Sequence, residues 1–116
     1  MDKRSEPRIE RQVKFFFEVY KCQEDPDLVG TSIECEAIDF STHGLQLRTN
    51  QEVPAATLLS ITIGVGDPFA MYLLRGEVRW TKTLAEEVIL MGVRISDAEG
   101  TDFERWLDQF DDTFNS

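Results

Sequence analysis

Histidine and cysteine are scarce in this chain. The single histidine, His43, lies in a turn segment, and Cys22 and Cys35 have no metal-ligand spacing. No serine or cysteine stands in a known nucleophile signature, and the glycines form neither a Walker loop nor a dinucleotide-binding fingerprint. These absences argue against catalysis and against a bound metal, so we expect a binding protein rather than an enzyme.

Long apolar runs are also missing. No stretch approaches the ~20 consecutive apolar residues that a membrane span requires. The first residues are polar and charged, and they contain no apolar segment of signal-peptide length. We therefore expect the chain to act in the cytoplasm.

Acidic residues outnumber basic residues by 22 to 12, for a formal net charge of −10. DNA, RNA and anionic membranes are bound through basic surfaces, so none of them is expected as a partner. The charge is unevenly distributed. Five cations against three acids give residues 1–14 a net +2, whereas one cation against seven acids gives residues 97–116 a net −6. A basic segment on an acidic body suits a small anion better than a polymer.

Hydropathy alternates with a period of two through most of the chain, which predicts β-strands. In the first strand, Phe15 and Phe17 share a face opposite Lys14 and Glu18. Strands are predicted at about 13–20, 30–39, 45–48, 59–63, 71–81 and 87–96. Six short strands with turn residues between them predict a mostly β fold, a six-stranded antiparallel β-barrel.

The period changes near the end of the chain. Large apolar side chains follow helical spacing at Phe103, Trp106, Leu107, Phe110 and Phe114. This stripe predicts a C-terminal α-helix over about 101–114 that packs against one opening or flank of the barrel. Thr101 and Glu104 fit a capping box, with Thr101 as the N-cap residue.

A chain of 116 residues has the length of one domain. Residues 1–12 show no periodicity and contain Pro7, so they are predicted to form a flexible arm. Residues 13–116 are predicted to form the barrel with its helix.

Two short motifs carry the functional signal. The first is RxxxR in the arm, at Arg4–Arg8, and the second is DxSxxG after the second predicted strand, at Asp39–Gly44. Further features follow at Gly76–Trp80 and Met91–Ile95. In this order, and about thirty residues apart, the two motifs resemble those of the PilZ family of cyclic di-GMP receptors. The resemblance covers nearly the whole chain as a single-domain member.

The resemblance implies that the ligand is held by Arg4, Arg8, Asp39, Ser41 and Gly44. The chemistry of these residues fits that role. Guanidinium groups pair with phosphate oxygens and with guanine O6 and N7. A carboxylate can accept from guanine N1–H and N2–H₂, and a glycine permits close approach of the backbone.

By the same resemblance, Trp80 offers a stacking surface to a guanine, an interaction worth about 1–3 kcal/mol. The alternative for Trp80 is a buried barrel residue on the face of Tyr72, Leu74 and Val78. Weaker candidates are Arg11 and Arg79, which would add electrostatic support, and Lys3, at a position that affects whether one or two ligands bind.

The expected function is therefore reception of cyclic di-GMP, with no cofactor besides this ligand. The arm becomes ordered over the ligand and creates a surface for a downstream protein. The alternative is a PilZ-like adaptor that works through protein–protein contacts and binds no nucleotide. The intact motif residues favour the receptor, because an adaptor has no need of that set.

Overall fold

The structure is a computed structural model that describes residues 13–65 and 70–114. The predicted arm, residues 1–12, lies outside the described residues. Within the described ranges, no helix combines the length and apolar character needed to cross a membrane. In chain order the elements are β1 (Val13–Lys21), the 3₁₀ turn η2 (Pro26–Leu28), β2 (Ser32–Ile33), β3 (Cys35–Phe40), β4 (Gly44–Thr49), β5 (Leu58–Val65), β6 (Ala70–Ala85), β7 (Val88–Ser96) and α1 (Phe103–Phe114).

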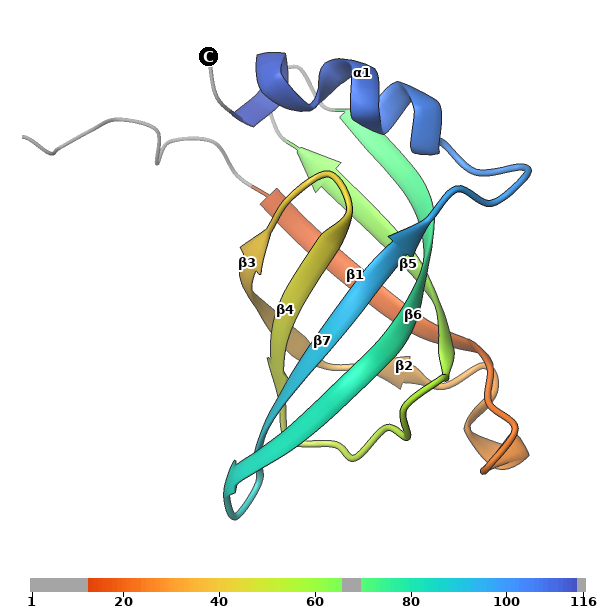
Figure 1. Cartoon of the computed structure of the whole chain (residues 1–116), viewed down its shortest axis with the longest axis vertical. Coiled ribbons are helices and arrows are strands. Elements are labelled where there is room, and N and C mark those ends of the chain that lie inside the picture. Colours follow the sequence, from red (N-terminus) through yellow and green to blue (C-terminus); the bar gives the residue numbers. More distant parts are fainter. Residues whose placement is uncertain (1–12, 66–69, 115–116) are drawn as a thin grey trace, which may run out of the picture.

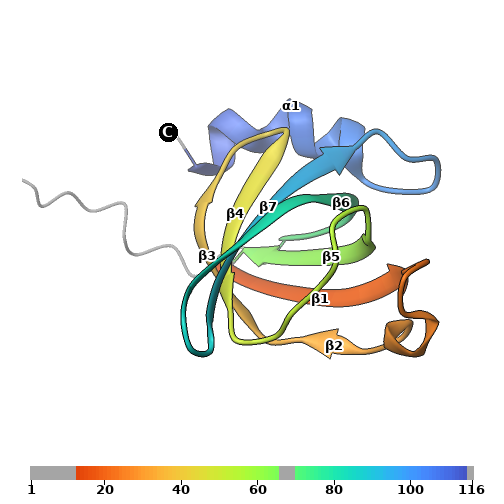
Figure 2. The same cartoon turned by 60° about the horizontal axis from the view of Figure 1, so that its bottom comes forward.

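The strands form one antiparallel sheet in the order β2-β1-β5-β6-β7-β4-β3. The strands at the two ends of this order, β2 and β3, are separated in the chain by Glu34 alone. The sheet therefore curls until its two edges meet at this residue, which gives the barrel-like shape seen in Figures 1 and 2. A mostly β, antiparallel, barrel-like fold with a C-terminal helix is thus confirmed.

The strand count differs from the prediction, because the segment predicted as one strand over 30–39 is two strands. Ile33 pairs with β1, whereas Cys35 already pairs with β4. The corner between them is held by Thr49, whose hydroxyl donates to the Glu34 carbonyl at 2.9 Å. The sheet accordingly has seven strands rather than six.

The core consists of the side chains that point into the barrel. On β1, Phe17 and Val19 are buried, whereas Lys14, Glu18 and Tyr20 are exposed, as the alternation predicts. The fully buried aliphatic side chains of the other strands are Leu47, Leu59, Ile61, Ile63, Leu74, Val78 and Met91.

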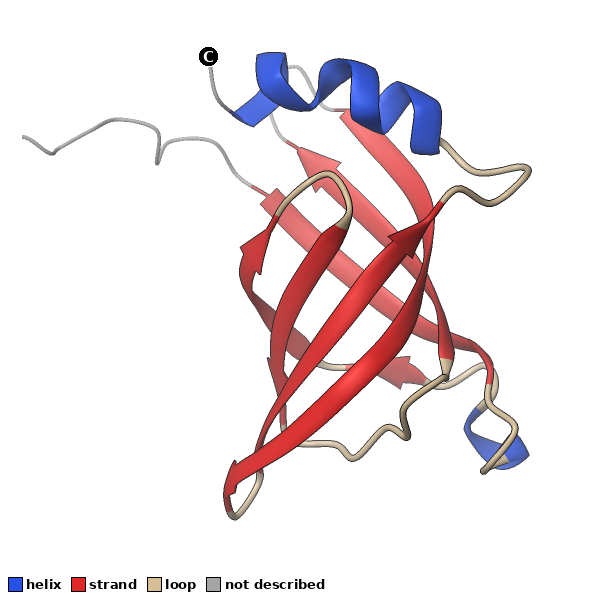
Figure 3. Ribbon diagram, in the orientation of Figure 1, coloured by secondary structure: helices blue, strands red, loops and turns tan. Residues whose placement is uncertain are grey.

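The helix α1 crosses one end of the barrel (Figure 3). Trp106 is fully buried there, with its ring centroid 5.3 Å from that of Tyr72 and 5.1 Å from that of Phe110. Leu107, predicted as part of the buried stripe, is 39% exposed, so the stripe is narrower than predicted. The aromatic side chains therefore hold the helix to the barrel.

The helix begins at Phe103, and the predicted N-cap role of Thr101 is wrong. The Thr101 hydroxyl donates to the Ala98 carbonyl instead, and the first helical bond is accepted by the carbonyl of Asp102. The Asp102 carboxylate accepts from the backbone N–H of Leu73 at 2.7 Å. This bond ties the start of the helix to β6.

Candidate functional site

A β-bulge in β6 determines where Trp80 points. The register between β6 and β7 shifts between Val78 and Trp80, which leaves Arg79 as the extra residue. Strict alternation would place Trp80 on the same face as the buried Val78. With the bulge, Arg79 and Trp80 are both exposed, Trp80 by 43%. The alternative of a buried barrel residue is therefore wrong, and the indole lies on the outer surface.

The indole of Trp80 lies against the backbone of β7 at Gly92. A Cβ atom placed on Gly92 would come within 2.2 Å of Trp80 Nε1. Only glycine leaves room for the ring at this position. The strand β7 therefore packs against one side of the indole, and much of the rest of the ring is exposed to solvent.

A second bulge, in β3, has the same effect on Asp39. The register between β3 and β4 shifts between Ala37 and Asp39, with Ile38 as the extra residue, and Asp39 becomes the partner of Gln46. Ile38 and Asp39 are both exposed. The Asp39 carboxylate is therefore presented on the outer face of the sheet.

The two bulges lie at the same level of the sheet. Asp39 pairs with Gln46 and Gln46 pairs with Gly92. Gly92 in turn pairs with Trp80. These residues form one row across β3, β4, β7 and β6, which at normal strand spacing spans about 14 Å. A carboxylate stands at one end of the row and an indole at the other.

The turn between β3 and β4 is anchored to the rest of the fold. Within it, the Ser41 N–H donates to the Gly44 carbonyl at 2.9 Å, and the His43 N–H lies 3.4 Å from Ser41 Oγ. The Trp106 indole N–H donates to the Thr42 carbonyl at 3.0 Å. The helix therefore fixes the position of the DxSxxG turn.

Two guanidinium groups lie beside this row. Arg94, on β7, pairs in register with Gly44 on one side and with Glu77 on the other. Arg79 Nη1 lies 3.6 Å from Glu77 Oε1, and both side chains are partly exposed. An exposed ion pair of this kind contributes about 0–1 kcal/mol, so Arg79 can exchange Glu77 for another anion at little cost.

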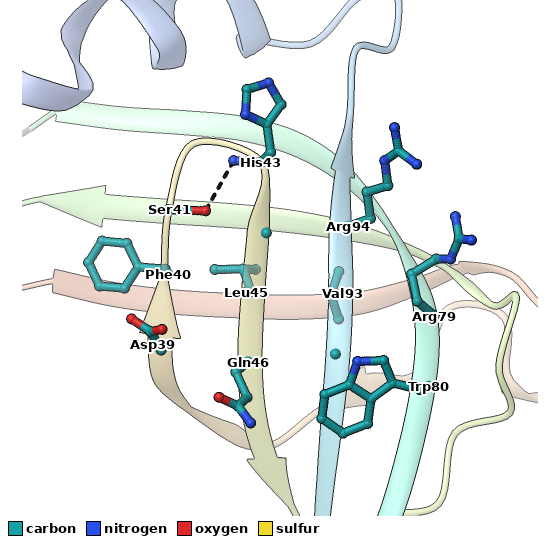
Figure 4. A pocket seen from close by; sticks show the side chains of 12 residues that line it. Asp39, Phe40, Ser41, His43, Leu45, Gln46, Arg79, Trp80, Val93 and Arg94 are labelled. Atoms are coloured by element: carbon teal, nitrogen blue, oxygen red, sulfur yellow. Dashed lines mark hydrogen bonds between the residues drawn. The ribbon is translucent and has the colours of Figure 1, made fainter.

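These side chains surround an open depression of about 400 Å³ on the outer face of β3, β4, β6 and β7 (Figure 4). It is lined by Asp39, Phe40, Ser41, His43, Gly44, Leu45, Gln46, Arg79, Trp80, Gly92, Val93 and Arg94. In Figure 4 both guanidinium groups extend to the same side of the indole. No trio of His, Cys, Asp or Glu among the described residues is arranged to hold a metal ion.

The depression brings together five of the residues predicted from the sequence, namely Asp39, Ser41, Gly44, Arg79 and Trp80. The other predicted residues lie outside the described part of the chain, and they are Lys3, Arg4, Arg8 and Arg11. Sequence reasoning missed Gln46 and Arg94 as lining residues. The alternation of hydropathy could have identified them. Each lies between two buried neighbours on its strand, so its side chain must point outward.

The arrangement suits a ligand that combines negative charge with a flat ring. The guanidinium groups of Arg79 and Arg94 can donate charge-assisted hydrogen bonds to phosphate oxygens. The indole of Trp80 can stack on a base, and the carboxylate of Asp39 can accept from ring or exocyclic N–H groups. A nucleotide has all three features.

Comparison with known proteins agrees with this chemistry. No curated protein and no solved structure matches the chain. A family model described as PilZ domain matches residues 2–110, a span that contains both motifs and every residue lining the depression. The chain therefore belongs to the PilZ domain family, a family of cyclic di-GMP receptors.

Proposed function

We propose that this chain is a cytoplasmic receptor that binds cyclic di-GMP in the depression between Asp39 and Trp80. The main support is the convergence described above. Two bulges and one anchored turn bring a carboxylate, an indole and two guanidinium groups from three strands onto a single open surface. The proposed action is binding alone, with no chemical step and no cofactor.

Each side chain has a role in this proposal. Trp80 stacks on one guanine, and Asp39 accepts from the N1–H and N2–H₂ groups of a guanine. Arg79 and Arg94 pair with phosphate oxygens. Gly44 keeps the turn free of a side chain, so that the backbone and the Ser41 hydroxyl can approach the ligand closely.

The first described strand, β1, contacts β3, the strand that carries Asp39. The ring of Phe15, near the start of β1, lies 5.4 Å from that of Phe40, which follows Asp39. Arg8 precedes Val13 by five residues, a reach of about 17 Å when extended. In this proposal Arg8 contacts the ligand in the depression, Arg4 contacts it from further along the same segment, and Lys3 and Arg11 are further cations.

Ordering of residues 1–12 over the ligand would form the output signal. The ordering consumes part of the contact energy. A micromolar Kd nevertheless requires only about −8 kcal/mol, and charge-assisted hydrogen bonds supply about 1.5–3 kcal/mol each. The ordered arm and the ligand together would create the surface that a downstream protein recognises.

Isothermal titration calorimetry with cyclic di-GMP tests the proposal, with GTP and cyclic GMP as ligand controls. The unmodified chain should bind with a micromolar or lower Kd, and Arg8→Ala should weaken binding at least about tenfold, the loss of roughly one charge-assisted contact. Arg48→Ala is the matched control. Arg48 is an exposed arginine paired with Glu36 at 2.5 Å, outside the depression, and its loss should leave the Kd unchanged.

Three outcomes would contradict the proposal. Absence of binding by the unmodified chain would favour the adaptor. Equal losses in Arg8→Ala and Arg48→Ala would indicate unspecific attraction between charges. Breakdown of cyclic di-GMP during incubation would indicate an enzyme.

A further inference from the structure

The strand β6 extends well beyond its neighbour β5. Its ladder with β5 runs from Ala70 to Glu77, and the Val78 backbone still bonds to the segment that leads into β5. From Arg79 to Ala85, β6 pairs with β7 alone. Figures 1 and 2 show this β6–β7 hairpin projecting past the rest of the barrel. Among the described residues, nothing pairs with the other edge of Arg79–Ala85, which we call the β6 edge.

The register shows which backbone groups face this open side. The Ile95 N–H donates to the His43 carbonyl on the β4 side, so the even-numbered residues of β7 direct their backbone groups toward β6. Trp80 and Lys82, which pair with Gly92 and Leu90, therefore bond to β7. Thr81 and Thr83 direct their N–H and C=O groups away from the hairpin. Their spacing of two residues is the repeat that an added antiparallel strand requires.

The β6 edge is also accessible from both faces of the sheet. Every residue from Arg79 to Ala85 is exposed, including Leu84 at 53%. The segment contains two cations, Arg79 and Lys82, and no acid; Arg79 is paired with Glu77, and Glu86 and Glu87 follow at the tip of the hairpin. An incoming strand would therefore meet backbone groups, the exposed apolar side chains of Trp80 and Leu84, and the positive charge of Lys82.

We propose that the β6 edge is a docking site for an extended acidic segment of a partner protein, which adds to the sheet as a further antiparallel strand. Backbone hydrogen bonds to Thr81 and Thr83 provide the affinity, and an acidic side chain opposite Lys82 provides the selection. A second copy of this chain fits less well. Two copies each carry a net charge of −10, and a twofold pairing centred on Lys82 places two lysines directly opposite each other.

The position of the edge connects it to the depression. Trp80 lines the depression and directly precedes Thr81 in the same strand. A segment docked at Thr81 and Thr83 would therefore lie beside any ligand stacked on the indole, a connection that rests on the proposed function. Docking itself does not require the nucleotide.

Amide hydrogen exchange followed by NMR tests the geometry first. In the free chain, the Thr81 and Thr83 amides should exchange much faster than those of Trp80 and Lys82, which bond to β7. A short dye-labelled peptide of alternating glutamate and valine is the binding probe, and a lysine–valine peptide is its charge control. The acidic peptide should slow exchange at Thr81 and Thr83 and raise the fluorescence anisotropy, whereas the basic peptide should do neither.

Thr83→Pro and Thr83→Ala form the matched pair of variants. Proline removes the outward N–H without touching the bonds to β7, and edge strands tolerate it. Thr83→Pro should weaken peptide binding about tenfold or more, whereas Thr83→Ala, which keeps the N–H, should bind as the unmodified chain does. Lys82→Glu should weaken binding of the acidic peptide and allow the basic peptide to bind. Thermal unfolding checks that each variant is folded.

Several results would overturn the proposal. These are slow exchange of both threonine amides in the free chain, no binding of the acidic peptide, or equal binding by Thr83→Pro and Thr83→Ala. Sedimentation equilibrium provides a further check. A dimer that Thr83→Pro dissociates would assign the edge to a second copy instead. All these assays are run without cyclic di-GMP, so failure of the receptor proposal leaves their outcome intact.

Discussion

Replacing Gly92 with alanine tests whether the support under Trp80 matters for ligand binding. The added methyl group would lie 2.2 Å from Trp80 Nε1 and 2.3 Å from Cε2, well inside the ~3.5 Å of ordinary contact. The indole must therefore leave its position over β7. Because Trp80 is exposed, it can turn into solvent, and little of the cost falls on the core.

The magnitude follows from the stack that is lost. Stacking of a base on an aromatic ring contributes about 1–3 kcal/mol, so Gly92→Ala should raise the Kd for cyclic di-GMP roughly 5- to 150-fold. The melting temperature should change by less than about 4 °C, since the free energy of unfolding changes by under roughly 1 kcal/mol. A large loss of affinity with a small loss of stability is the expected signature.

Calorimetry measures the Kd for cyclic di-GMP, and acrylamide quenching of tryptophan fluorescence measures how far the Trp80 ring is exposed to solvent. Trp106 is fully buried, so added quenching in Gly92→Ala reports on Trp80. Trp80→Ala and the double variant complete a mutant cycle. In the Trp80→Ala background, Gly92→Ala should have almost no further effect on the Kd. Unchanged affinity in Gly92→Ala, or an equal loss in both backgrounds, would refute the idea that Gly92 acts through the indole.

Three other predictions concern the barrel. Gly76→Ala places a methyl group 2.6 Å from Val93 Cγ1 in the core, and this overpacking should lower the free energy of unfolding by about 1–3 kcal/mol in urea titrations; an unchanged midpoint would contradict it. Trp106→Phe removes the 3.0 Å bond to the Thr42 carbonyl and should lower stability by about 1 kcal/mol while weakening cyclic di-GMP binding; full affinity would show that the turn needs no anchor. Burial raises the pKa of Cys35 from 9.0 to about 12, so the unfolded chain loses its thiol proton first and stability should fall as the pH rises from 9 to 12. Denaturation over that pH range should show a decline in stability that is shallower in Cys35→Ser, and an equal decline in both proteins would contradict the prediction.

The sequence predicted most of the fold because alternation reports burial directly. Alternation could not reveal that the strand predicted over 30–39 is divided at Glu34 into β2 and β3. Ile33, Cys35 and Ala37 continue one pattern of inward side chains through the corner, although the segment changes from pairing with β1 to pairing with β4. Hydropathy records which face a residue occupies, and it carries no information about which strand lies alongside.

The site was predictable where it depends on motifs and unpredictable where it depends on register. The motif located Asp39, Ser41 and Gly44, which line the depression. The position of Trp80 remained open between two faces, because a bulge leaves no mark in composition or periodicity. Only the pairing of β6 with β7 places the indole outside.

The bulge at Arg79 makes the number of residues, and not only their kind, part of the design of the surface. Deleting this one residue would leave Val78 opposite Val93 and Trp80 opposite Gly92 in a regular ladder, so the indole would stay on the outer face while the guanidinium beside it would be lost. Substitution at the same place would remove a charge and leave that geometry in place. The extra residue therefore determines how many successive side chains β6 presents on the outer face, two with the bulge and one without it. The pairing of a tryptophan with a glycine, as Trp80 pairs with Gly92, is therefore a better mark of a functional relative than the spacing between Val78 and Trp80.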